Sequence, residues 1–287
     1  MTGLKYRTLL VEAYRAWNAR DWATAAVRLA EVARRHPEHR DAGAWWFDAA
    51  LACKLLRDWP RAYELGKLAA TRAARGAEDP AFWNLGIAAT ALGDWVTARE
   101  SWAAFGIRLP SGHGEINENL GITPIRLNPD GAGEVVWARR LCPARARVLS
   151  VPTTGSGRRY GEIVLHDGEP KGEREVDGRR YQVFDEIALW HPSELPTLTV
   201  DVAAARPVDM IALIAIFEEW EYGAEPWSGV RMAGGSSREP RQAADHQASG
   251  RQRVGLAAPP RRAHELLDTW RAGDPDRRDW SDLLVAN

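Results

Sequence analysis

Residues 79–112 read DPAFWNLGIAATALGDWVTARESWAAFGIRLPSG, and the pattern in this stretch decides the fold of the first part of the chain. Its dipeptide Asp94-Trp95 occurs earlier as Asp58-Trp59 and as Asp21-Trp22, at separations of 36 and 37 residues. A fixed spacing of this length is typical of an internal structural repeat. Residues 1–112 are therefore expected to form one repeat domain.

Small and large residues recur in register with the three tryptophans. Small residues at helical spacing let two helices approach closely, and bulky residues fill the gaps between them. Aspartate is a preferred helix N-cap, so each Asp is expected to cap a second helix and each Trp to lie mostly buried just inside it. The pattern therefore predicts two antiparallel helices in each repeat. The small positions are Ala25, Ala62 and Ala98, then Ala16, Cys53 and Ala89, then Ala13, Ala50 and Gly86.

This pattern resembles the tetratricopeptide repeat, a helix-turn-helix unit, over residues 6–39, 43–76 and 79–112. The third unit matches best, whereas Glu12, Gly66 and Ala74 depart from the family pattern. The resemblance implies that a partner lies along a groove built from the first helix of each unit. The matching positions of the third unit are Phe82, Leu85, Gly86, Ala89, Gly93, Ala98, Trp102, Phe105 and Pro110.

Carried over to this chain, the resemblance implies a mostly apolar and aromatic partner-binding face. The family's clamp for a terminal carboxylate is poorly matched, because few cationic or amide side chains fall on the groove positions. Such a face suits an amphipathic helix of another protein, or the protein's own C-terminal region. The expected partner-binding residues are Arg7, Tyr14, Trp17, Phe47, Leu51, Lys54, Trp83, Asn84 and Ile87.

Residues 113–287 predict an α+β region with a different organisation. Residues 113–132 are expected to be a linker, and residues 133–192 a small β-barrel or sandwich of short strands around the hairpin turn Asp177-Gly178. Residues 193–287 predict an α+β subdomain with two strand-then-helix units, a further strand at 230–232 and a polar, mobile loop at 233–250. Proline before each helix supports these helix starts.

Composition excludes several classes of protein. The 287 residues are 45% hydrophobic and 27% charged, as in ordinary globular domains. A pI of about 6.7 argues against nucleic-acid binding. No apolar run suggests a membrane span or a secretion signal, so the protein is expected to be cytoplasmic. Its two cysteines form no metal-binding motif, and no cofactor is expected.

Two groups of residues suggest chemistry in the second half, but each has a simpler interpretation. The segment 155–161 (GSGRRYG) combines glycines with two arginines, yet a strand-like run follows it where a phosphate site needs a helix. The acid-base candidates His166, Asp185, Glu186 and His191 lack a nucleophile motif. The sequence therefore favours a bacterial-type protein-protein adaptor or scaffold without a catalytic constellation. An enzyme or ligand sensor in the C-terminal region, regulated by the repeats, is the alternative.

Overall fold

The computed structural model describes residues 2–131, 133–176, 178–227 and 251–286, with side-chain surroundings from residue 6 onward. The chain divides into two compact units, Met1–Asn117 and Glu118–Asn287. The predicted loop at 233–250 and the predicted strand at 230–232 lie outside the described residues.

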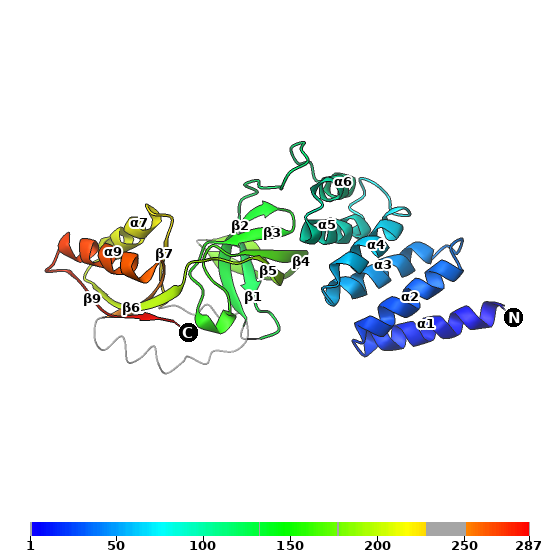
Figure 1. The fold of residues 1–287 in the computed structure, drawn as a ribbon, viewed down its shortest axis with the longest axis horizontal. Helices are drawn as coiled ribbons and strands as arrows, with labels where there is room; N and C mark the ends of the chain where they lie inside the picture. Colours follow the sequence, from blue (N-terminus) through cyan, green and yellow to red (C-terminus); the bar gives the residue numbers. More distant parts are fainter. Residues whose placement is uncertain (1, 132, 177, 228–250, 287) are drawn as a thin grey trace. The chain divides into compact units, whose positions relative to one another are not determined.

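The first unit consists of six helices, each of which packs against the next along the chain (Figure 1). This arrangement is compatible with a helical repeat. The helices are α1 (Thr2–Asn18), α2 (Trp22–Arg35), α3 (Ala42–Leu55), α4 (Trp59–Ala70), α5 (Pro80–Leu92) and α6 (Trp95–Phe105).

The predicted aspartate caps are confirmed at all three repeats. Asp21, Asp58 and Asp94 each accept a backbone N–H from the residue three positions later, at 3.1–3.3 Å. Each carboxylate thereby satisfies one of the N–H groups that the first turn of a helix leaves without a partner. The even-numbered helices therefore all start in the same way, at a tryptophan.

The expectation that these three tryptophans are mostly buried is confirmed. Trp22, Trp59 and Trp95 each keep only a minor part of their surface exposed. Each is the first residue of its helix, so its ring lies at the end of the packed layer. The alanine three residues later, one turn inside the helix, is covered more completely in every repeat.

The second unit begins with five strands: β1 (Ile122–Leu127), β2 (Glu134–Cys142), β3 (Arg145–Val148), β4 (Ile163–Val176) and β5 (Arg179–His191). Neighbouring strands pair antiparallel in chain order, and β1 also pairs in parallel with β5. Their alternate side chains share one apolar core around Ile125, Val136 and Phe184. Strand β4 is longer than the short strands predicted for residues 133–192, and its register against β5 shifts between Ile163 and Gly172.

Strand β1 corrects the prediction of a linker at residues 113–132. Pro124 within the run and Gly121 before it suggest a connecting segment in the sequence. In the structure Thr123, Pro124 and Ile125 are nevertheless buried, because β2 and β5 pair with this segment from two sides. Tertiary pairing therefore overrides the local signal.

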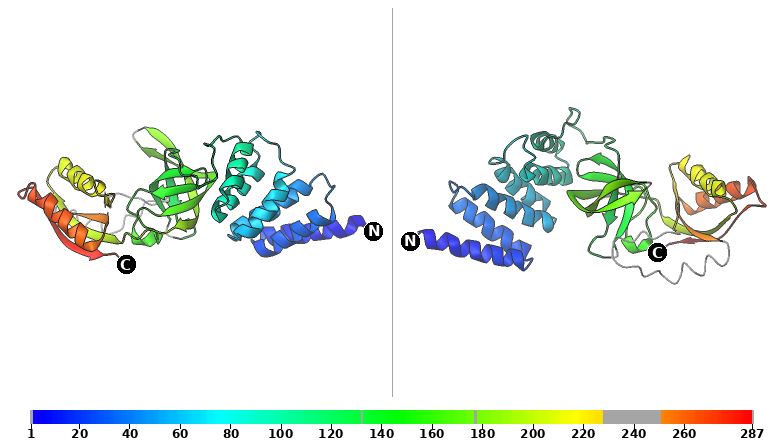
Figure 2. Two further views of the ribbon diagram at one scale, coloured as in Figure 1. Left: turned by 45° about the horizontal axis from the view of Figure 1, so that its top comes forward. Right: turned by 180° about the vertical axis from the view of Figure 1, so that it is seen from behind.

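The described residues of the rest of the second unit form a four-stranded sheet with two helices on one face (Figure 2). Its elements are β6 (Thr197–Ala204), α7 (Pro207–Glu218), β7 (Gly223–Pro226), β8 (Gln252–Ala257), α9 (Pro260–Ala272) and β9 (Arg278–Val285). The strand order is β7-β8-β6-β9, with every neighbouring pair antiparallel. This is the split β-α-β-β-α-β topology. The two predicted strand-helix units are present, whereas β7 and β9 were not predicted.

Candidate functional site

The nine predicted partner-binding residues lie on α1, α3 and α5, the first helix of each repeat. We call the surface that these three helices present the first-helix face. Arg7 and Tyr14 are exposed, and five of the others are half-buried. Lys54 and Ile87 are buried, at 5% and 0% exposure, so their prediction as partner contacts is wrong. The half-buried residues are Trp17, Phe47, Leu51, Trp83 and Asn84.

A hydrogen bond between Tyr14 and Asp48 links α1 to α3 on this face. Tyr14 Oη donates to Asp48 Oδ2 at 2.8 Å. Burial, together with the neighbouring carboxylate, raises the pKa of Tyr14 well above its ordinary value. Burial also raises the pKa of Asp48, against the opposing effect of the Tyr14 hydrogen bond. The tyrosine therefore remains a neutral donor at any physiological pH, and its ring edge stays open to solvent.

A second hydrogen bond, between Lys54 and Asn84, links α3 to α5. Lys54 Nζ donates to Asn84 Oδ1 at 2.8 Å. A buried ammonium needs such partners, because removing the charge from water is costly. The predicted cation and amide of the face are thus committed to holding the helices together rather than to gripping a ligand.

Trp83 is committed to packing within its own helix pair. Its ring lies edge-on to Trp102 at 5.1 Å and to Phe105 at 4.9 Å, both on α6. Its indole Nε1 is buried and has no hydrogen-bond partner among the described residues. Of the predicted partner-binding residues, the other apolar or aromatic side chains that keep part of their surface exposed are Tyr14, Trp17, Phe47 and Leu51.

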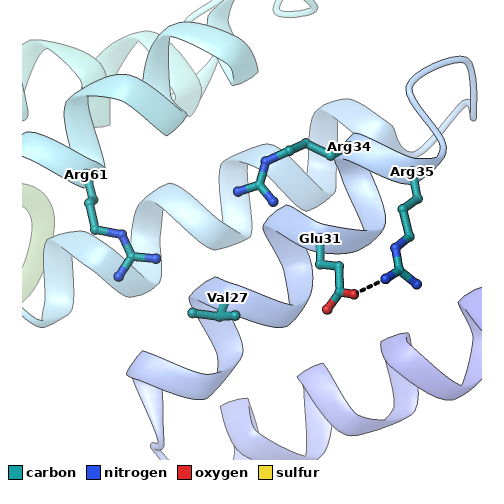
Figure 3. Close-up of a pocket in the computed structure, with 5 residues that line it drawn as sticks. All are labelled: Val27, Glu31, Arg34, Arg35 and Arg61. Carbon is teal, nitrogen blue, oxygen red and sulfur yellow. Dashed lines mark ion pairs between the residues drawn. The ribbon is translucent and has the colours of Figure 1, made fainter.

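A shallow hollow of about 460 Å³ lies between α2 and α4, the second helices of the first two repeats (Figure 3). It is lined by Val27, Glu31, Arg34, Arg35 and Arg61. Val27 is 48% exposed, so the hollow has an apolar wall beside three guanidinium groups. We call this site the arginine hollow.

The charges of the arginine hollow are only partly balanced. Glu31 pairs with Arg35 at 2.5 Å and with Arg28 at 3.2 Å. Within the part of the chain that the structure describes, Arg61 pairs only with the distant carboxylate of Asp58, at 3.7 Å. Arg34 forms no ion pair with any described residue; its guanidinium lies 5.9 Å from the centre of the Trp46 ring. Two cations therefore remain available to an anion, and the sequence carries no motif that predicts their meeting.

In the second unit, the glycine-rich segment 155–161 is held by the protein's own carboxylates. Arg158 Nε donates to Glu186 Oε1 at 2.7 Å, and Arg158 Nη2 donates to the same oxygen. Glu186 is 5% exposed and also accepts the backbone N–H of Asn128 at 3.1 Å. The guanidinium that a phosphate would need is thus already paired with a buried anion.

Three further glutamates fasten the backbone around this segment. Glu134 accepts the N–H and the hydroxyl of Thr153 at 2.9 and 2.8 Å, and Glu162 accepts the N–H of Arg159 at 3.1 Å. Glu225 of β7 accepts the N–H of Val151 at 2.7 Å, and Trp227 Nε1 donates to the carbonyl of Val151 at 2.9 Å. These carboxylates thus fix a loop and join the five strands to the second sheet.

The four acid-base candidates are not gathered around one open site. His166 is fully buried, and its Nδ1 donates to the carbonyl of Asp167 at 2.8 Å. Burial lowers the pKa of His166 to about 4, so the ring is neutral near pH 7. Asp185 is held by both ends of the Arg126 guanidinium at 2.7 and 2.8 Å. His191 is exposed at the end of β5.

No protein-family model, curated protein or solved structure matches this chain. The candidate sites of the helical unit are the first-helix face and the arginine hollow. Among the described residues, no group of three or more His, Cys, Asp or Glu side chains is arranged to hold a metal ion. The described helices include none that is both long and apolar enough to cross a bilayer.

Proposed function

We propose that the protein is a protein-binding adaptor whose first unit is a set of three tetratricopeptide-like repeats. The three aspartate caps, the registered small residues and the consecutive helix packing support this family assignment. We further propose that β1–β5 close into a small barrel, since β1 pairs with strands on both of its sides. The adaptor would bind through the helical unit.

The observation that carries the proposal is the open apolar strip on the first-helix face. Tyr14, Trp17, Phe47 and Leu51 come from two neighbouring helices and all keep part of their surface in solvent. The polar groups between them are already satisfied by the Tyr14–Asp48 and Lys54–Asn84 hydrogen bonds. A partner can therefore cover the strip without leaving a buried polar group unpaired, which would cost free energy.

The chemistry of the strip defines the partner. Aromatic and aliphatic anchors favour a segment that presents its own apolar side chains, such as one face of an amphipathic helix. The strip offers no free cation at its centre, because Lys54 is buried against Asn84. We therefore expect the partner to contribute leucine-like or aromatic residues rather than a terminal carboxylate.

A matched pair of substitutions tests this proposal in the full chain. Leu51→Lys places a charge in the strip, whereas Leu68→Lys places the same charge on α4, where Leu68 is 42% exposed. Affinity capture from cells, followed by mass spectrometry, should lose a specific partner with Leu51→Lys and keep it with Leu68→Lys. Circular dichroism must show equal helix content in both variants. Equal capture by both variants would remove the first-helix face from consideration.

The arginine hollow supports a second candidate function, the binding of an acidic peptide side chain. Arg34 and Arg61 are available to a carboxylate, and Val27 offers an apolar contact beside them. Arginine favours carboxylates because its fork can donate two parallel hydrogen bonds. A labelled oligoglutamate peptide should bind the full chain more tightly than the matching oligoglutamine peptide. Arg34→Glu should abolish that difference, while Arg15→Glu, at an exposed position of α1, should preserve it.

A further inference from the structure

Helix α7 is almost entirely apolar, which is unusual for a helix on the surface. Its sequence is PVDMIALIAIFE, in which only Asp209 and Glu218 can carry a charge. Asp209 is fully buried and is held by Arg206 and Arg278 at 2.8 and 3.1 Å. A helix that is apolar on all sides is normally covered on all sides.

Only one side of α7 is covered by the described residues. Met210, Leu213 and Phe217 face the sheet and belong to its core. On the opposite side, Val208 and Ile211 are 53% and 63% exposed, and Ala215 is exposed one turn further on. Residues spaced by three and four positions lie on one helix face. We call Val208, Ile211 and Ala215 the α7 stripe.

The neighbouring helix α9 shows what an ordinary solvent face looks like in the same layer. Its outer surface carries ion pairs between residues three or four apart, among them Arg262–Glu265 at 2.8 Å and Arg271–Asp268 at 2.7 Å. Both helices pack on the same face of the same sheet. The apolar outer surface is therefore particular to α7 and is not a general property of this layer.

The carboxyl end of α7 is acidic. Glu218, Glu219 and Glu221 gather there, where the helix dipole is negative, and none of them forms an ion pair with a described residue. Within the monomer this placement is unfavourable. At the amino end, where the helix dipole is positive, the arginines Arg206, Arg277 and Arg278 are balanced by the aspartates Asp209, Asp274 and Asp276.

We propose that the α7 stripe is the interface of a homodimer, in which α7 packs antiparallel on α7 of a second copy. A two-fold axis makes such an interface self-complementary. The antiparallel arrangement places the three glutamates of each helix beside the positive amino end of its partner. Ala215, a small residue, lets the two helices approach closely near Ile211.

Charge decides in favour of a second copy over an unrelated helix. The carboxyl end of the stripe is acidic, and its own antiparallel image places these glutamates beside Arg206 and the positive end of the helix dipole. Trp220, which follows the end of α7, is 52% exposed and has the Arg262 guanidinium 3.8 Å from its ring centre. A single helix pair gives an interface at the small end of the stable range, so dissociation in the micromolar range is expected.

Sedimentation velocity of the full chain tests the proposal over concentrations from about 1 to about 200 µM. The wild type should shift from the 31.9 kDa monomer toward twice that mass. Ile211→Asp should remain monomeric throughout, and Val11→Asp, a control at a helix position with 58% exposure, should dimerise like the wild type. Glu218→Arg combined with Glu219→Arg should weaken dimerisation by about tenfold or more.

A crosslinking arm keeps the test decisive if Ile211→Asp fails to fold. Cys53 and Cys142 are buried, so a cysteine introduced by Ile211→Cys is the reactive thiol. A short bis-maleimide should join two Ile211→Cys chains and should not join two Val11→Cys chains. A monomer at every concentration would overturn the proposal, as would a dimer that Ile211→Asp leaves intact. The repeat-binding function does not depend on either outcome.

Discussion

The Trp102 ring lies directly over Gly86, so close that a Cβ atom at position 86 would be 2.6 Å from Cη2 of the ring. Gly86 belongs to α5 and Trp102 to α6, and both are buried. The smallest residue of one helix thus receives the largest side chain of the next. Trp83 then packs against the same ring at 5.1 Å, so the contact organises the third helix pair.

Gly86→Ala should destabilise the helical unit even though alanine favours helices. The added methyl group must displace a fully buried indole, and such overpacking costs about 1–3 kcal/mol. Chemical denaturation followed by circular dichroism measures the loss. Gly114→Ala is the control, because nothing lies within 4 Å of a Cβ at that position. If both variants unfolded at the same denaturant concentration, the contact would not matter for stability.

Asp94→Ala should cost more than the ordinary loss of a helix cap, which is about 1 kcal/mol. Asp94 caps α6 and also accepts the hydroxyl of Tyr63 at 2.7 Å. That hydrogen bond is the main reason why the pKa of Asp94 is lowered. The carboxylate therefore contributes stability above its ordinary pKa, and this contribution is lost as the pH falls through the lowered value. Asp94→Ala should lose more free energy of unfolding than a simple cap loss does. In urea denaturation, Tyr63→Phe alone should reproduce much of this additional loss, because it removes the same hydrogen bond and keeps the cap.

His166 should make the stability of the second unit depend on pH. Its pKa is lowered to about 4 by burial, so the unfolded chain takes up a proton before the folded one does. Stability is then full above about pH 6.5 and falls as the pH drops from about 6.5 to about 4, by up to roughly 3 kcal/mol. His166→Gln should flatten this part of the curve when denaturation midpoints are measured across that window. An unchanged slope would contradict a neutral, buried imidazole.

Arg158→Ala should destabilise the protein by about 3 kcal/mol or more, because Glu186 would remain buried without its cation. The adjacent Arg159 is exposed, and its side chain forms no ion pair with a described residue. Arg159→Ala should therefore change the free energy of unfolding by less than about 0.5 kcal/mol. Thermal melts of the two variants compare neighbouring arginines directly, and similar melting temperatures would refute the paired role of Arg158.

Local signals made the helical unit predictable. The three Asp-Trp pairs, the caps and the small residues all act within one helix pair, so they can be read from spacing alone. Trp22, Trp59 and Trp95 are mostly buried as the repeat pattern predicts, and the alanine three residues later in each helix is covered more completely. Lys54 and Ile87 were predicted to contact a partner but are buried, since the family pattern indicates which face of a helix a residue lies on and not how far neighbouring helices cover its side chain.

Features that depend on distant partners were harder to predict. Strand β1 forms because β2 and β5 pair with a segment that contains proline. The arginine hollow needs α2 and α4 to bring Arg34 and Arg61 together, and no spacing rule links these two residues. Strand β9 carries aspartates and a serine that conceal its apolar residues, and it is stabilised by pairing with β6.

Site-specific photo-crosslinking in living cells tests the central claim, that a partner lies on the first-helix face, most directly. A photoreactive residue at position 51 of the full chain should yield one dominant adduct with another protein, while the same residue at position 27, on α2, should not yield that adduct. Peptide mapping should place the crosslink on an apolar segment of the partner. Adducts of equal yield at positions 27 and 51, or a position-51 crosslink formed only within the protein's own chain, would contradict the proposed adaptor function.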